Sequence, residues 1–169
     1  MSEVNHLADA LENHFANPKA SSFVHFVTVS DGLTGAQAAQ APAERFNSVW
    51  GVTNHVAFWM DVTRAALVGE QVDLAAWGLS EMGAGWPPLG DMNDANWQAA
   101  RQRALDVNHA LAEAIRTLDD AALAQPSEQT WGQPPYQLIL SIYSHNSHHT
   151  SEILCIRHMQ GLWVDHPWT

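Results

Sequence analysis

The stretch PYQLILSIYSHNSHHTSEILCIRHMQ, residues 135–160, determines the fold more than any other part of the chain. After its first residue it contains no proline or glycine, and Gly161 follows it directly, as is typical of a long helix. At about 100° per residue, one narrow face of this helix collects Leu138, Ile142, His145, His149, Glu152 and Ile156. The sequence therefore predicts a helix that turns two histidines and a carboxylate toward the interior.

The two histidines on this face are four residues apart. Side chains at this spacing are neighbours, with Cβ atoms about 6 Å apart, so His145 and His149 can converge on one metal ion at about 2.0–2.1 Å. Spacing alone does not establish a metal site, because ten histidines among 169 residues give roughly 0.6 such pairs by chance. The alternative is a pair of core histidines that hydrogen-bond to each other or to water.

Two other long segments have helical periodicity. The segment 46–69 contains no proline and has His55 in the middle of its apolar stripe. Helical periodicity places Thr53, Asp61 and Arg64 on the far side of this helix. The segment 94–118 is predicted to be a helix with Asn93 or Asp91 as its N-cap. Its inward positions are Trp97, Ala100, Ala104, Val107, Leu111, Ile115 and Leu118.

A fourth helix is predicted near the N-terminus, from an N-cap at Ser2 to the stop at Asn17. The segment 32–45 is small, polar and contains proline, which favours a loop or a weak helical turn. Residues 71–92 are rich in glycine and proline and are long enough to cross a bundle, which leaves the helices on either side parallel. We expect an all-α four-helix bundle with long crossover connections, formed by residues 1–169 as a single domain.

The composition excludes several classes of function. Seven basic residues against eighteen acidic ones give a formal charge of −11, which disfavours binding to nucleic acid or to anionic membranes. No apolar run approaches the ~20 residues of a membrane span, and the first residues lack a secretory signal. Cys155 is the only cysteine, in agreement with a reducing compartment. We therefore expect a cytoplasmic protein.

Two segments resemble a known family. FNSVWGVTNHVAFW, residues 46–59, and YSHNSHHTSEI, residues 143–153, are similar to the signature segments of the DinB/YfiT-like family, also called the damage-inducible protein family. Its members are metal-binding four-helix bundles with one histidine on the second helix and an HxxxH pair on the fourth. The resemblance implies that His55, His145 and His149 bind one divalent transition metal per chain, zinc or nickel.

One departure from the family affects the chemistry. The family often has Arg-Gly-Gln after the last ligand, whereas this chain has Thr150, Ser151 and Glu152. An arginine donor is lost and a carboxylate is gained on the metal-facing side. Glu152 is a candidate catalytic residue as a general base on metal-bound water; the alternatives are an extra ligand, a partner of a ligand histidine, or a purely structural contact with a neighbouring helix.

Other residues are weaker candidates. His148 lies about 80° from the ligand face, which favours packing or a surface position, and Cys155 lies about 100° away, where we expect a buried small residue. His25 and His109 are single histidines in the sequence pattern, outside any HxxxH pair. Four tryptophans are candidates to line a pocket over the metal, with plain core packing as the alternative: Trp59, Trp86, Trp97 and Trp131.

The family resemblance also implies a class of reaction. Its characterised members include transferases and isomerases that use low-molecular-weight thiols such as bacillithiol or mycothiol. Three imidazole ligands leave an open coordination position, as in catalytic metal sites. We expect a thiol-dependent S-transferase with a small-molecule substrate, or else a metal-dependent hydrolase, or a non-catalytic metal-binding stress-response protein. Family members often pair, so we also expect a homodimer, with the tail 162–168 as the first candidate contact.

Overall fold

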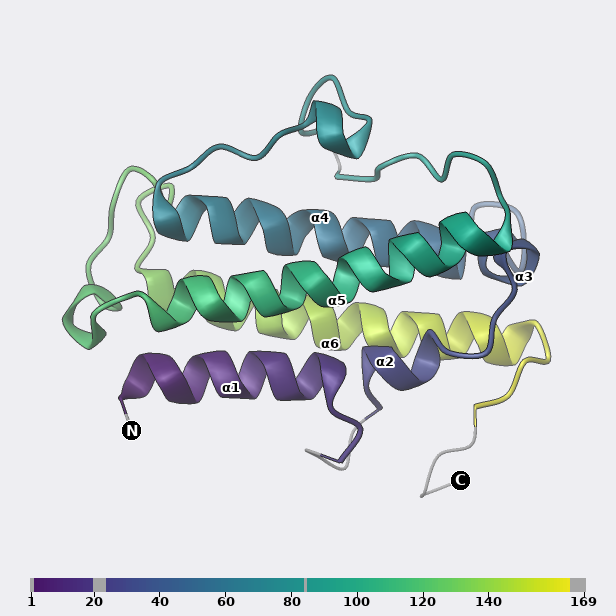
Figure 1. Ribbon diagram of the computed structural model, residues 1–169, viewed down its shortest axis with the longest axis horizontal. Helices are drawn as coiled ribbons and strands as arrows, with labels where there is room; N and C mark the ends of the chain where they lie inside the picture. The colour runs from purple at the N-terminus through teal and green to yellow at the C-terminus, as the bar shows by residue number, and fades with distance from the viewer. Residues whose placement is uncertain (1, 20–23, 84, 165–169) are drawn as a thin grey trace.

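The computed structural model describes residues 2–19, 24–83 and 85–164. Within these ranges every regular element is a helix, and four long helices form a bundle (Figure 1). The long helices are α1 (Glu3–Ala16), α4 (Val49–Val68), α5 (Asp94–Arg116) and α6 (Pro135–Met159). The short ones are α2 (Phe26–Val29), α3 (Gly35–Ala39), η1 (Ala75–Trp77) and η2 (Asp120–Ala122). The predicted all-α four-helix bundle is confirmed.

The connection between α4 and α5 runs along the length of the bundle. Figure 1 shows α4 and α5 running in the same direction, with α1 and α6 running the opposite way, as the long crossover predicts. Trp77, in η1, fastens the crossover to the bundle: its indole nitrogen donates to Asp61 at 3.0 Å, and the guanidinium of Arg103 lies 3.3 Å above its ring. The crossover is therefore held against α4.

The helix ends follow capping chemistry. The hydroxyl of Ser48 accepts from the backbone N–H of Gly51 at 3.0 Å, and α4 begins there rather than at Phe46, which is 52% exposed. Asn93 caps α5, as one of the two predicted residues. The segment before α4 forms the short helix α3, stabilised by a capping box that begins at Thr34. This is the weak helical turn predicted there.

The core is closed by large apolar side chains between α4 and α5. The indoles of Trp50 and Trp97 pack with ring centroids 5.7 Å apart, and both side chains are buried. Trp97, Ala104, Leu111 and Ile115 are fully buried, as predicted for the inward face of α5. Replacing either tryptophan by alanine would remove about 3–5 kcal/mol of stability.

Helix α4 is buried on nearly all sides, which the sequence did not predict. Thr53, assigned to the solvent side by helical periodicity, is fully buried, and its hydroxyl donates to the carbonyl of Val49 at 2.9 Å. The reason is that α4 packs against α5, α6 and α3 at once. A helix enclosed in this way has no continuous polar face.

None of the helices in the described ranges has the length and hydropathy needed to cross a membrane. The tail 162–168 was predicted as a dimer contact, and its residues 165–168 lie outside the described ranges. Trp163 is 72% exposed, and its ring packs on His158 with centroids 4.3 Å apart.

Candidate metal centre

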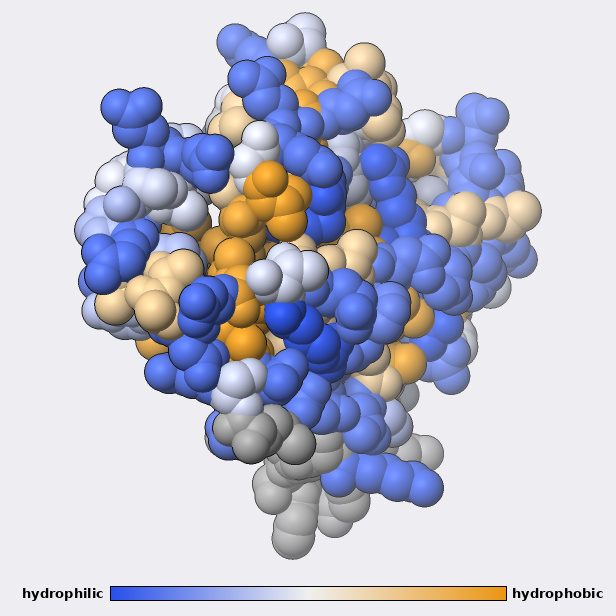
Figure 2. Space-filling view, turned by 60° about the vertical axis from the view of Figure 1, so that its left-hand side comes forward, coloured by the Kyte–Doolittle hydropathy of each residue, from blue (hydrophilic) through white to orange (hydrophobic). Residues whose placement is uncertain are grey.

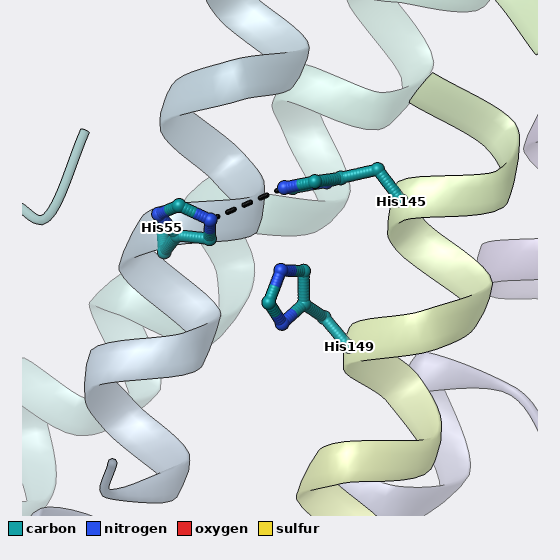
Figure 3. Close-up of side chains that lie close together, drawn as sticks. All are labelled: His55, His145 and His149. Atoms are coloured by element: carbon teal, nitrogen blue, oxygen red, sulfur yellow. Dashed lines mark hydrogen bonds between the residues drawn. The ribbon is translucent and has the colours of Figure 1, made fainter. Parts of the chain in front are cut away.

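Three histidines lie close together between α4 and α6. His55 projects from α4, and His145 and His149 project from successive turns of α6 toward it (Figure 3). The Nε2 atoms of His55 and His145 are 3.2 Å apart, and one ring nitrogen from each of the three histidines lies within 4.8 Å of the others. The structure thus brings together the three predicted ligand residues.

The outer nitrogen of His55 is held by the crossover. Its Nδ1 lies 2.7 Å from the carbonyl oxygen of Gly85, which can only accept a hydrogen bond. The Nδ1 of the neutral ring therefore carries the proton and donates, so Nε2 presents its lone pair to the other two histidines. Gly85 has φ +67°, and a Cβ there would lie 2.4 Å from the indole nitrogen of Trp59, so only glycine fits this approach.

The outer nitrogen of His149 is held by Glu152. The Nδ1 of His149 donates to Glu152 Oε2 at 2.6 Å, and the side-chain amide of Asn47 donates to the other carboxylate oxygen at 2.8 Å. A carboxylate can only accept these bonds, so His149 also turns the lone pair of Nε2 toward the cluster. Carboxylates and carbonyls in this position fix the tautomer and orientation of metal-binding histidines.

His145 and His55 are neutral at pH 7. Burial lowers the pKa of His145 to about 4, and repulsion from His149 and His55 acts in the same direction. Burial is also the largest cause of the lowered pKa of His55, which is 7% exposed. Rings that stay uncharged keep their lone pairs available without first releasing a proton.

This arrangement could hold a metal ion. Two donor atoms that share an ion at about 2.0–2.1 Å lie roughly 2.8–3.0 Å apart in octahedral and roughly 3.3–3.4 Å apart in tetrahedral geometry. The 3.2 Å between His55 and His145 lies between these values. A second group, formed by His148, His149 and Glu152, is also compact enough. However, His148 is exposed, and the other two members are already hydrogen-bonded to each other.

The buried face of α6 is rotated about the helix axis from the face that the sequence predicted. Its most buried positions are Ile139, Asn146, Ile153 and Ile156, of which only Ile156 was on the predicted face. His145, His149 and Glu152 are only partly buried. The two histidines therefore lie at the edge of the buried stripe, where it faces α4. This position gives the cluster access to solvent on one side.

The tryptophans divide between the site and the core. Trp86 stacks on the ring of His55, with centroids 4.0 Å apart and planes inclined by 15°. Trp59 and Trp131 line a cleft of about 260 Å³ that reaches His145. Trp97 belongs to the core instead. Trp86 and Trp59 therefore lie beside the cluster, and Trp131 lines the cleft that leads to it.

The remaining candidates lie elsewhere, and one prediction is wrong. Cys155 was expected to be buried, but it is exposed. The buried positions near it include Ile153 and Arg157, and Cys155 lies on the opposite, outer face of α6. His25 is buried near His14, with ring centroids 5.9 Å apart, and His109 pairs with Glu12 on the surface. None of these residues reaches the cluster of His55, His145 and His149.

Sequence reasoning missed three contributors to the site: Asn47, Gly85 and the stacking role of Trp86. A backbone carbonyl carries no side-chain signature, so nothing in the pattern could assign Gly85 to His55 across 30 residues. The glycine itself, within the Gly-Trp-Pro-Pro sequence of the crossover, was the one available sign of a close backbone approach. Asn47 precedes the cap of α4 and has the appearance of an ordinary turn residue.

Comparison with known families identifies the family of this chain. A sequence model of the DinB superfamily matches residues 25–153, more than half of the 169 residues, including all three histidines and Glu152. This protein belongs to the DinB superfamily. Comparisons with curated proteins and with solved structures found no match.

Proposed function

We propose that this protein is a metal-dependent enzyme of the thiol S-transferase type, with His55, His145 and His149 holding one divalent transition metal, zinc or nickel. One observation carries the proposal: one ring nitrogen from each of three imidazoles lies within 4.8 Å of the others, and a cleft opens beside His145. Three protein ligands with an open side are the donor set of catalytic rather than structural zinc sites.

When bound, the metal would supply Lewis acidity that lowers the pKa of a thiol at the open position. The protein's own groups prepare this position. Gly85 and Glu152 fix the orientation of two ligand rings, and the indole of Trp86 covers the ring of His55. In the transfer, the thiol sulfur forms a bond to an electrophilic carbon, the leaving group departs with the bonding electron pair, and the thiol proton passes to solvent.

Hydrolysis is the alternative reaction of such a site, with Glu152 as the general base. The hydrogen bonds of Glu152 support a different role: one carboxylate oxygen accepts from His149 and the other from Asn47. A base engaged in this way would have to break a charge-assisted bond before it could take a proton from water. We therefore assign Glu152 to the orientation of His149.

The test is a screen of the metal-loaded protein with the electrophile 1-chloro-2,4-dinitrobenzene, with and without a panel of low-molecular-weight thiols. We expect chloride release and thioether formation only when a thiol is present, and loss of this activity in His149→Ala. Chloride release at the same rate without thiol, with 2,4-dinitrophenol as the product, would identify a hydrolase. Metal binding with neither reaction, across several electrophiles, would leave a non-catalytic binding protein and refute the proposal.

A further inference from the structure

Two clefts meet beside the metal centre. The first, of about 260 Å³, extends from His145 between Trp59 and Leu138. The second, of about 430 Å³, continues along the end of α4 to the start of the crossover. Val62 and Trp131 line both clefts, so the two are adjacent. Figure 2 faces the end of the bundle where α4 ends, and hydrophobic residues form a strip there between hydrophilic flanks.

The charges around these clefts disfavour anions. Among the described residues that line either cleft, none is a lysine or arginine, and Glu70 is the charged one. The nearby guanidinium of Arg64 is already paired with Glu70 at 2.8 Å and with Asp61 at 2.9 Å. A carboxylate or phosphate bound in the clefts away from the three histidines would lose its water without gaining a cation from the described lining. The formal charge of −11 for the chain acts in the same direction.

Trp131, which lies between the two clefts, has an unusual backbone. Its φ is +51°, in the left-handed region that bulky residues rarely adopt, and its side chain is 56% exposed. The turn from Ser127 holds it there: the N–H groups of Trp131 and Gly132 donate to Glu128 and Ser127. A strained residue with a large exposed ring is characteristic of a functional position, because packing alone would not favour it.

We propose that the two clefts form one substrate site for an uncharged molecule with an aromatic or branched apolar body, whose face packs on Trp131. The inference rests on the proposed function in one respect: the reacting end of the molecule lies at His145. The apolar part of the lining, which includes Val62, Leu74 and Trp131, binds the body, which is removed from water. The absence of a free cation in the described lining selects against substrates that carry a carboxylate or phosphate.

The binding test uses two unreactive probes of nearly the same shape, 2-naphthamide and 2-naphthoate, titrated by calorimetry into the protein. Each is measured with zinc bound and again after chelation, so that binding of the carboxylate to zinc is separated from binding to the clefts. We expect 2-naphthamide to bind more tightly than 2-naphthoate in the chelated protein, by about tenfold or more, because only the anion loses hydration without a partner.

The variant Trp131→Gly suits the left-handed backbone and removes the indole. We expect it to weaken 2-naphthamide binding by about tenfold while melting at or above the temperature of the wild type. Trp163→Ala removes an exposed tryptophan outside both clefts, and this variant should bind 2-naphthamide as tightly as the wild type does. Equal affinity for both probes, no binding of either, or unchanged binding in Trp131→Gly would overturn the inference.

This experiment is independent of catalysis. Selective binding of 2-naphthamide together with no thiol transfer would leave the substrate site standing and remove the proposed function. Thiol transfer to charged and uncharged electrophiles at similar rates, together with equal binding of the two probes, would leave the proposed function standing and remove the substrate site.

Discussion

Gly85→Ala tests the link between the crossover and the metal centre. The carbonyl of Gly85 accepts the Nδ1 proton of His55 at 2.7 Å, and a Cβ on residue 85 would lie 2.4 Å from Trp59 Nε1 and 2.9 Å from Phe58 Cδ1. These separations are far below ordinary contact distances, so the backbone of residue 85 must move. The move takes the carbonyl away from His55.

The size of the effect follows from two contributions. Alanine in the left-handed region costs about 1–2 kcal/mol, and the added methyl group in a packed site costs about 1–3 kcal/mol. We therefore expect the unfolding free energy to fall by about 2–5 kcal/mol. Loss of the hydrogen bond that orients a metal-binding histidine typically weakens metal affinity by about 10–100-fold, and we expect Gly85→Ala to lose zinc affinity in that range.

The control is Gly90→Ala in the same crossover. Gly90 has φ +69°, close to that of Gly85, but a Cβ on residue 90 would meet nothing within 4 Å among the described residues. It carries the same backbone penalty without the collision. Zinc affinity is measured by competition with a chromophoric chelator, and stability by urea unfolding. Unchanged zinc affinity in Gly85→Ala, or an equal loss in Gly90→Ala, would refute the role of the Gly85 carbonyl.

Three other predictions follow from the site. Lowering the pH from 6.5 to 4 should destabilise the metal-free protein by about 2–3 kcal/mol through His145, measured by urea unfolding. The unfolded chain protonates His145 near its ordinary pKa, whereas the buried ring, whose pKa burial lowers to about 4, stays largely neutral until the pH approaches 4. His145→Gln should flatten this slope, and an unchanged slope would contradict the assignment. Glu152→Ala should weaken zinc binding by about 10–100-fold in chelator competition. Glu152→Gln keeps an oxygen that accepts from His149 and should weaken zinc binding less. Equal losses of affinity in the two variants would argue against this contact. Chelation should leave helical circular dichroism intact, because the core around Trp50 and Trp97 does not involve the metal; collapse of the helical signal would make the metal structural.

The sequence was sufficient to predict the four long helices and their order. Helical periodicity located the inward face of α5 from Trp97 to Ile115, and glycine and proline located the crossover. These features are determined locally, by spacing and by turn chemistry, and so can be predicted from one sequence. The same reasoning gave α4 a polar face at Thr53, because it could not anticipate how many neighbours would surround that helix.

The candidate site was predictable only in part. His145 and His149 share one helix, so their relation follows from helical geometry, while His55 was connected to them through the family resemblance. The contacts that orient the rings depend on tertiary structure. Gly85 reaches His55 with a backbone atom, and Asn47 reaches Glu152 across 105 residues. Neither contact leaves a periodic pattern in the sequence.

The central claim is that His55, His145 and His149 hold one metal ion, and elemental analysis tests it most directly. Protein purified without a histidine tag should contain close to one transition metal ion per chain. His55→Ala and His149→Ala should lose most of it, because removing one of three neutral ligands greatly lowers affinity, while His148→Ala, the exposed neighbour, should retain it. Full occupancy in both ligand variants, or equal loss in His148→Ala, would contradict the claim.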